Sequence, residues 1–247
     1  MSTPLLLEVV RGGPVHRIRL PSPTRGHALD DIGLDALCGA LRESARDASS
    51  RIVALEGSAG TFCIGMDLDA ATGRGTRSFT PRKYADTLAL VAEVGVVVVA
   101  VVDGRALGGG VGLAAACDLV FATPRATFAL PEALLGLVPA IASPPLVRRV
   151  GFQRAYRLAL TTEPVDAARA LALALVDEVH ENPEDGLRRL ARRLRHVEPA
   201  AIAAIKAHFR RVHRAPDEAE ELAIERLDAL LASAAVRERI AAVAASE

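Results

Sequence analysis

The longest apolar run of the chain extends from Val96 to Val102 and consists mainly of valine. A run of this length is too short to cross a membrane and predicts a strand that is buried on both faces. An Asp-Gly pair ends the run, and the glycines Gly108–Gly110 follow a few residues later. The apolar segment 111–116 then predicts a helix. The pattern therefore predicts a buried strand, a glycine loop and a helix in close succession.

Shorter apolar runs and amphipathic stretches occupy most of the remaining chain. The predicted strands are residues 5–10 and 15–20, which form a hairpin, and residues 52–55 and 119–122. The predicted helices are residues 28–46, 81–93, 187–196, 199–212 and 216–243. Segments 21–26 and 70–80 have the composition of loops. Strands that alternate with helices indicate an α/β fold.

The glycine loop has a chemical interpretation beside a structural one. Glycines let another atom approach the backbone closely, and the N–H groups of Gly108–Gly110 are not covered by side chains. The following helix directs its positive dipole end toward the same place. This arrangement suits a developing negative charge such as a thioester enolate oxygen. The alternative is tight packing of strand against helix. The spacing excludes a nucleotide-binding P-loop or a dinucleotide fingerprint.

A second segment has the same order of elements. The predicted strand 52–55 is followed by a loop and by Phe62–Leu68, which contains Gly65 and Asp67. Asp67 stands where it can cap the first turn of a helix. Two segments of this kind favour a site built from two loops, each at a strand-to-helix junction.

Together these segments resemble the enoyl-CoA hydratase/isomerase (crotonase) superfamily. Phe62–Leu68 is similar to its F-x-x-G-x-D-L motif, and Gly108–Gly110 to its G-G-G motif. Further similar segments follow in the family's order, at 127–132 with 135–139, and at 151–155 with 158–165 and 175–179. The resemblance implies an α/β spiral of β-β-α turns over residues 1–195. It also implies a C-terminal helical region, 196–247, that forms trimers. The alternative is that these helices only close the core.

The resemblance also implies a site. Its oxyanion donors are the backbone N–H groups of Met66 and Gly109, and its acid/base residue is Glu132. The flanking residues that the motif match assigns to substrate binding are Ile64, Gly65, Asp67 and Gly108. Glu132 precedes the apolar residues 133–135, and we expect such surroundings to raise its pKa. The alternative for Glu132 is a helix N-terminal residue that interacts with the dipole.

Gly112 marks a departure from the best-known family members, because hydratases carry a second glutamate at the matching position. A single carboxylate fits a double-bond isomerase or a dehydratase. Segments 102–105, 110–112 and 137–155 resemble the polyketide-synthase-associated dehydratases of β-branching cassettes, which also lack this glutamate. Those proteins remove water from a 3-hydroxy-3-carboxyalkyl chain on an acyl carrier protein. One hypothesis is that Gly112 leaves room for such a branched acyl group.

Several other residues have possible roles by resemblance. Arg25 and Ala28, with His27 between them, match the loop that holds the CoA or phosphopantetheine arm. Lys206 and Phe209 fall on a helix that can reach a nucleotide phosphate or adenine; a solvated helix lysine is the alternative.

Three other kinds of residue remain as alternatives. Lys83 with His208 would suit a related decarboxylase. Tyr84 and Tyr156 either donate a hydrogen bond in the site or pack with one polar end in water. Cys63 lies in the first motif, but no basic partner that would activate its thiol is identifiable.

Composition narrows the function classes. The formal net charge of zero gives no general attraction to nucleic acid or to an anionic membrane. The three cysteines have no disulfide spacing, and no cluster has metal-ligand spacing. We expect no cofactor apart from CoA or phosphopantetheine as part of an acyl-CoA or acyl carrier protein thioester. No signal peptide or spanning segment is recognisable, so the predicted location is cytoplasmic.

The expected assembly is a homotrimer or a hexamer of two trimers. The apolar tail residues expected against other subunits are Ile202, Ile205, Leu222, Leu227 and Leu230. A non-catalytic crotonase scaffold is a further alternative, which the neutral charge and the retained Glu132 disfavour.

Overall fold

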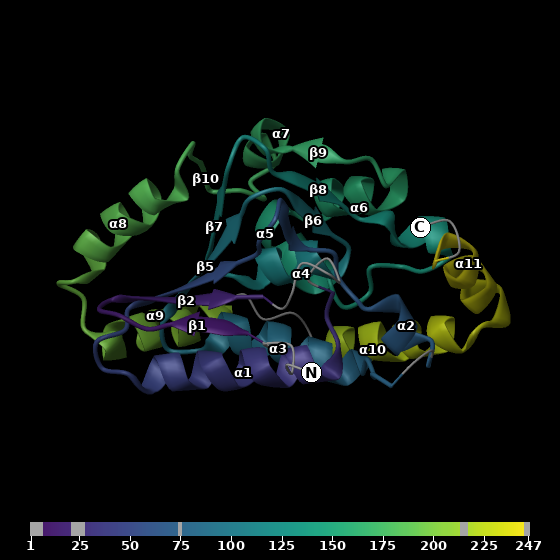
Figure 1. Ribbon diagram of the computed structural model, residues 1–247, viewed down its shortest axis with the longest axis horizontal. Coiled ribbons are helices and arrows are strands. Elements are labelled where there is room, and N and C mark those ends of the chain that lie inside the picture. Colours follow the sequence, from purple (N-terminus) through teal and green to yellow (C-terminus); the bar gives the residue numbers. More distant parts are fainter. Residues whose placement is uncertain (1–6, 21–27, 74–75, 213–216, 245–247) are drawn as a thin grey trace.

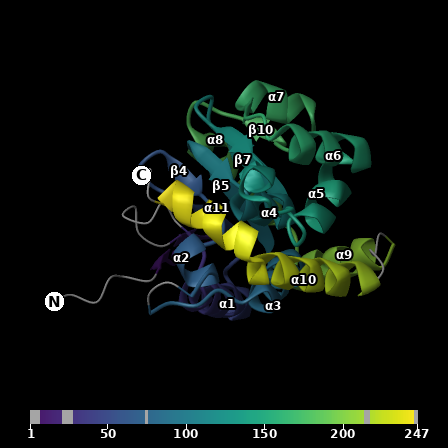
Figure 2. The ribbon, with the colours of Figure 1, turned by 90° about the vertical axis from the view of Figure 1, so that its right-hand side faces the viewer.

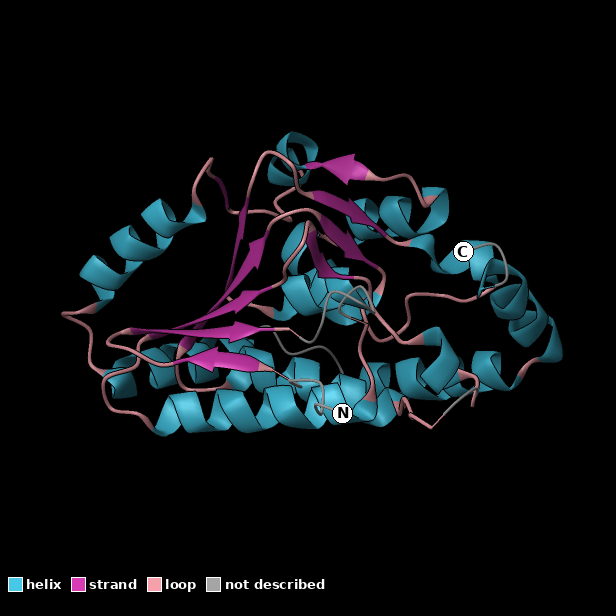
Figure 3. Ribbon diagram, viewed as in Figure 1, coloured by secondary structure: helices cyan, strands magenta, loops and turns pink. Residues whose placement is uncertain are grey.

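The structure is a computed structural model that describes residues 7–20, 28–73, 76–212 and 217–244. Strands and helices alternate along the chain, which confirms the α/β prediction (Figure 1). Two sheets stand at an angle to each other, and helices surround them (Figure 3). Within the described residues no helix combines the length and the hydrophobicity that crossing a bilayer requires.

The larger sheet has the strand order β1-β2-β3-β5-β7-β10. β1 and β2 form the predicted antiparallel hairpin, and the other neighbours pair in parallel. The predicted valine strand, β5, lies in the interior of this sheet. The strands are β1 (Glu8–Val10), β2 (Val15–Arg19), β3 (Ile52–Glu56), β5 (Val97–Val102), β7 (Leu119–Ala122) and β10 (Glu178–Val179).

The smaller sheet takes one strand from each successive turn of the chain. Its order is β4-β6-β8-β9. After β3, β5 and β7 in the larger sheet, the chain enters β4, β6 and β8 in the smaller one and then a helical segment. This is the expected spiral of β-β-α turns. The strands are β4 (Thr61–Cys63), β6 (Arg105–Leu107), β8 (Thr127–Ala129) and β9 (Val165–Asp166).

The helices cover both sheets and form the C-terminal region. Those in the spiral are α1 (Asp31–Arg46), α2 (Leu68–Ala71), α3 (Pro81–Glu93), α4 (Gly109–Ala116), the 3₁₀ turn η2 (Pro131–Leu135), α5 (Ser143–Val150), α6 (Phe152–Thr161), α7 (Ala167–Ala172) and α8 (Pro183–Leu194). The tail consists of α9 (Pro199–Val212), α10 (Asp217–Ala232) and α11 (Ala234–Ala244). Figure 2 shows α10 and α11 along one side of the molecule.

The core is mainly aliphatic, with a few phenylalanines, and lies on both faces of the larger sheet. One face packs against α1, α3, α4 and the smaller sheet, and it contains most of the buried residues. The other face, around Phe121, is covered by Leu187 of α8. Burial of the valine strand on both faces confirms the prediction for the segment 96–102.

Three predictions of helix boundaries were wrong. The predicted helix 187–196 begins at Pro183, because the Asn182 side chain accepts the Glu184 N–H at 3.1 Å and caps the helix there. The first helix begins at Asp31 and not at Ala28, because the carboxylate of Asp30 accepts the Gly33 N–H at 2.8 Å and caps the helix there. The predicted helix 216–243 is two helices, which are separated at Ser233. The Ser233 N–H bonds to the Leu230 carbonyl three residues back, at 3.0 Å, and this tight turn ends α10.

The tail packs on its own chain. α11 contacts η2, and Val236 and Ile240 of α11 belong to the main core. Ile202 and Leu227, which we expected against other subunits, are likewise buried within this chain. Ile205 and Leu222 remain exposed, with 56% and 67% of their surface accessible. Leu230 is partly buried against the same core. Trimer formation stays a prediction, and of the five residues that we expected against other subunits only Ile205 and Leu222 are exposed.

Candidate active site

The first side of the site is the loop between β4 and α2. An extended segment at Leu29 runs beside this loop: the Leu29 N–H donates to the Gly65 carbonyl at 2.7 Å, and the Asp67 N–H donates to the Leu29 carbonyl at 2.9 Å. Met66 lies between these two bonds, and its own N–H donates to no other group in the described part of the chain. Asp67 caps α2 by accepting the N–H groups of residues 69 and 70, both at 3.0 Å, which confirms its predicted capping role.

The second side is the start of α4. Gly109 is the first residue of this helix, so its N–H has no intrahelical partner. No other described residue accepts a hydrogen bond from it. The two loops are in close contact here, because a Cβ added at Gly65 would lie 2.7 Å from the Gly109 nitrogen. Gly65 also has a φ of +86°, which favours glycine. Two unpaired N–H groups thus occur where the two loops meet, beside a helix N-terminus.

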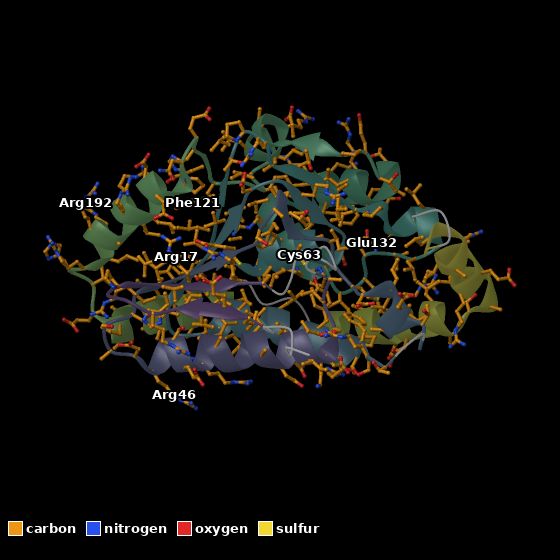
Figure 4. All side chains as sticks on the ribbon, viewed as in Figure 1. Arg17, Arg46, Cys63, Phe121, Glu132 and Arg192 are labelled. Carbon is orange, nitrogen blue, oxygen red and sulfur yellow. The ribbon has the colours of Figure 1, made fainter. Side chains whose placement is uncertain are left out.

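Glu132 supplies a carboxylate next to these donors. It belongs to η2, which follows directly after β8, and a Cβ added at Gly108 would lie 3.0 Å from Glu132 Oε1. Glu132 Oε2 is buried and has no hydrogen-bond partner among the described residues. Burial raises the pKa of Glu132 to about 7. Figure 4 shows Glu132 and Cys63 toward the centre of the molecule, whereas Arg46 and Arg192 lie at its periphery.

The apolar residues that follow Glu132 account only in part for the expected apolar surroundings. Ala133 is exposed and Leu134 is 68% exposed, whereas Leu135 is half-buried against the core. Gly108, which is distant in sequence, also lies against the carboxylate. η2 is in turn held by the tail, since a Cβ at Gly136 would lie 2.3 Å from Arg239 Nη1 of α11.

The space beside Gly112 is filled. A Cβ added there would lie 2.5 Å from Tyr84 Oη and 2.7 Å from the Ala142 Cβ. The hypothesis that Gly112 leaves room for a branched acyl group is therefore wrong for this position. A hydroxyl and a methyl group stand where the side chain of a second glutamate would begin.

Tyr84 is the residue of this site that sequence reasoning placed only among alternatives. It projects from α3, is 4% exposed, and donates a hydrogen bond from its hydroxyl to the Gly109 carbonyl. Burial raises its pKa well above 10, and nearby Cys63 and Glu132 raise it further, so the hydroxyl keeps its proton. No local pattern distinguishes it from a packing tyrosine. Tyr156, by contrast, is 49% exposed and stacks on Phe152.

The other residues that were predicted to bind the substrate lie in different parts of the chain. Arg25 and His27 fall outside the described residues, whereas Ala28 is half-buried directly before Leu29. Ile64 is also half-buried, in the β4–α2 loop. Phe209 is 68% exposed on α9.

Lys206 is buried, and its ammonium donates to Asp118 Oδ2 at 2.6 Å and to the Val96 carbonyl at 2.9 Å. Neither a nucleotide contact nor a solvated helix position fits this burial. Its charge is instead used within the chain, between α9 and the strands of the larger sheet.

Cys63, considered as a nucleophile, and Lys83 with His208, considered for a decarboxylase, lie in three different surroundings. Burial raises the pKa of the Cys63 thiol to about 12, so it stays protonated. Lys83 forms an ion pair with Asp35 of α1 at 2.5 Å, on the exposed side of α3. The His208 ring contacts Phe209 on α9.

Together, the two N–H groups and Glu132 can perform one kind of chemistry. The N–H groups can bind an oxygen that becomes negative, and the dipole of α4 adds to their effect. A carboxylate with a pKa of about 7 can accept and return a proton near neutral pH. These are the requirements for removing a proton next to a carbonyl group.

Comparisons with known proteins lead to one family. A profile of the enoyl-CoA hydratase/isomerase family matches residues 11–240. The bacillaene synthase dehydratase of Bacillus subtilis is 32% identical over 159 residues, which span 63% of this chain and 61% of that protein. The 2,3-dehydroadipyl-CoA hydratase of Escherichia coli is 33% identical over 83% of this chain and 81% of its own.

Solved structures show the same fold. A putative polyketide biosynthesis enoyl-CoA hydratase from Bacillus subtilis superposes with a TM-score of 0.92 over 99% of both chains, at 24% identity. An enoyl-CoA hydratase from Mycobacterium avium superposes with a TM-score of 0.86, at 32% identity, over 99% of this chain and 98% of its own. These likenesses confirm the fold that the motifs predicted.

Proposed function

Because this chain belongs to the enoyl-CoA hydratase/isomerase family, we propose that it is an acyl-thioester dehydratase of the hydratase/lyase type that uses one carboxylate. The proposed substrate is a 3-hydroxy-3-carboxyalkyl chain on an acyl carrier protein, in polyketide β-branching. Similarity to the bacillaene synthase dehydratase supports this choice. A CoA thioester of the same acyl group is the alternative carrier.

The reaction begins with the thioester carbonyl oxygen bound to the Met66 and Gly109 N–H groups. Glu132, as a carboxylate, accepts the proton from the α-carbon, and the electron pair of that C–H bond moves to the carbonyl oxygen as an enolate. Each N–H donor of this kind contributes about 3 kcal/mol to transition-state stabilisation. The loop that carries Met66 is joined to Leu29 by backbone hydrogen bonds, so we expect the Met66 side chain to be replaceable.

The enolate then collapses to expel the 3-hydroxyl group. The α–β double bond forms, the β-carbon–oxygen bond breaks, and Glu132 returns its proton to the departing oxygen to form water. One carboxylate thus carries both proton transfers, and it ends in its starting state. The observation that carries this proposal is Glu132, which is half-buried with a buried Oε2 and has a pKa of about 7, beside two N–H groups that donate to no other described residue.

The single carboxylate also supports a second candidate, a double-bond isomerase. In that reaction Glu132 takes a proton from one carbon of the acyl chain and delivers it to another, and no water is lost. The space beside Gly112, filled by Tyr84 and Ala142, favours either chemistry over the two-carboxylate hydration of the best-known hydratases.

Mass spectrometry of the thioester distinguishes these reactions. The enzyme is incubated with a carrier-bound 3-hydroxy-3-carboxyalkyl group and with the matching CoA thioester. Loss of one water, absent in Glu132→Gln, is the expected result. An isomerase would instead act on an enoyl thioester. The mass of that thioester would stay unchanged, and its absorbance would shift as the double bond moves. Turnover by Glu132→Gln at the wild-type rate would contradict the assignment of Glu132.

We also propose that the protein assembles as a trimer or as a hexamer of two trimers. The exposed apolar residues of the tail support this assembly. They are Ile205, Phe209, Val212 and Leu222. Light scattering at micromolar concentration tests the proposal, and a monomeric mass would contradict it.

A further inference from the structure

Gly109 is enclosed by two other parts of the chain. A Cβ added at Gly109 would lie 3.2 Å from Tyr84 Oη on one side and 3.4 Å from the Gly65 Cα on the other. The Tyr84 hydroxyl also donates a hydrogen bond to the Gly109 carbonyl. The backbone that carries the second oxyanion donor is therefore restrained by a side chain from α3.

A restraint on this backbone is needed to fix the direction of the Gly109 N–H. Residues 108–110 are glycines, which have no side chains to restrict their backbone torsions. The direction of the Gly109 N–H depends on those torsions, and a misplacement of about 1 Å in a site of this kind costs up to about 100-fold in rate. A hydrogen bond to the adjacent carbonyl limits the rotation of this segment without occupying the N–H itself.

The tyrosine is itself held firmly. Its ring packs beside Phe79 at a centroid distance of 6.0 Å, and its N–H donates to the Thr80 carbonyl at 3.2 Å. Thr80 is tied to Asp31 at the start of α1, whose carboxylate accepts the Thr80 N–H and O–H, both at 2.7 Å. Position 84 is thus linked to α1, which directly follows the Leu29 segment that orders the Met66 loop.

The same hydroxyl is one of the groups that leave no space for a side chain at position 112, together with Ala142. A side chain at 112 would begin 2.5 Å from Tyr84 Oη, so this hydroxyl and a glutamate at 112 exclude each other in this arrangement. The absence of a second carboxylate and the presence of the tyrosine hydroxyl are therefore linked, because both groups would need the same space.

We propose that Tyr84 is a positioning residue that orients the Gly109 N–H for the thioester oxygen, and that Gly112 is required to leave space for its hydroxyl. The inference rests on the proposed function, because it assigns Gly109 to the binding of that oxygen. Tyr84 itself acts through the backbone and not by proton transfer.

The first test is Tyr84→Phe, which keeps the ring and removes the hydrogen bond. We expect kcat to fall about tenfold while KM stays within about twofold, because substrate contacts away from the carbonyl are unchanged. Tyr156→Phe is the matched control, since it removes an exposed tyrosine hydroxyl, and its kcat should equal that of the wild type. Wild-type kcat in Tyr84→Phe would overturn the proposal.

A binding measurement separates this proposal from the proposed function. A cinnamoyl thioester that carries an electron-donating ring substituent absorbs at longer wavelength when its carbonyl is polarised. We expect a red shift on binding to the wild type and a clearly smaller shift in Tyr84→Phe at equal saturation. Since no turnover is involved, an unchanged shift overturns the role of Tyr84 even if the proposed reaction is correct. A reduced shift supports that role even if no water is lost from any substrate tested.

The link to position 112 has its own test. Gly112→Ala should displace the Tyr84 hydroxyl and reduce both kcat and the red shift as Tyr84→Phe does. The substitution is made in an Ala142→Gly background, because this removes the Ala142 methyl group, which a new Cβ would meet at 2.7 Å; the Ala142 Cα, at 3.0 Å, remains. Adding Tyr84→Phe to this variant should lower kcat by less than a further twofold. Independent, multiplicative losses from the two substitutions would contradict the shared mechanism.

Discussion

The carboxylate of Glu132 lies against the backbone of Gly108, so closely that a Cβ at Gly108 would be 3.0 Å from Oε1. Gly108 has φ +53° and ψ −120°, a conformation that other residues rarely adopt. It immediately precedes the oxyanion donor that we assign to Gly109. One glycine thus brings the proton-transfer group and the oxyanion site next to each other.

Gly108→Ala should damage both stability and activity. We expect the free energy of unfolding to fall by about 1–3 kcal/mol from backbone strain, and kcat to fall at least tenfold as Glu132 is displaced. Urea unfolding and steady-state kinetics measure the two effects. Gly39→Ala is the control, because a Cβ at Gly39 in α1 meets no atom within 4 Å and φ is ordinary there. It should retain full activity.

Activity should depend on the ionisation of Glu132. The proposed mechanism requires its carboxylate form, and burial raises the Glu132 pKa to about 7. We therefore expect kcat/KM to rise about tenfold per pH unit below pH 7 and to level off above it. A rate profile from pH 5 to 9 tests this. A profile that is already level from about pH 5.5 upward, as for a glutamate with the ordinary pKa of 4.5, would show that burial does not act on this group as inferred.

The same raised pKa predicts a change in stability. Folding favours the protonated form of Glu132, so its contribution is complete below the unfolded pKa of 4.5 and is lost as pH rises through about 7. Glutamine does not ionise. Between pH 5 and pH 8 the stability of Glu132→Gln relative to the wild type should therefore increase by about 2 kcal/mol. Urea unfolding at both pH values gives this difference, and a value independent of pH would contradict the prediction.

Lys206 should matter for stability and not for thioester binding. Lys206→Met leaves Asp118 without its buried cation, and we expect the free energy of unfolding to fall by about 2–4 kcal/mol. Lys83→Met, at the other lysine of the chain, removes an exposed ion pair with Asp35 and should change stability little. Affinity for an acyl-CoA should be unchanged in both. A selective loss of CoA affinity in Lys206→Met would restore its nucleotide role.

Some helices and strands could be predicted from the sequence, and others could not. The valine strand, the hairpin and the helices 81–93 and 199–212 were predictable, because hydrophobic periodicity and helix-ending residues act locally. The motif around Asp67 predicted its cap for the same reason. The separation of α10 from α11 was not predictable, since both segments are amphipathic and the break lets α11 pack on a turn about 100 residues earlier in the chain.

The order of amino acids was enough to predict the fold class and to locate the family motifs, the glycines that let two loops meet, and the missing glutamate at position 112. What surrounds these residues became clear from the packing of elements that are distant in the chain. Leu134 is beside Glu132 in sequence but points to solvent, whereas Gly108 is 24 positions away and helps to bury the carboxylate. Tyr84 and Ala142 fill the space at Gly112, and Asp118 pairs with Lys206. Periodicity describes which face of a segment is buried, but the atoms that meet across that face depend on how distant elements pack.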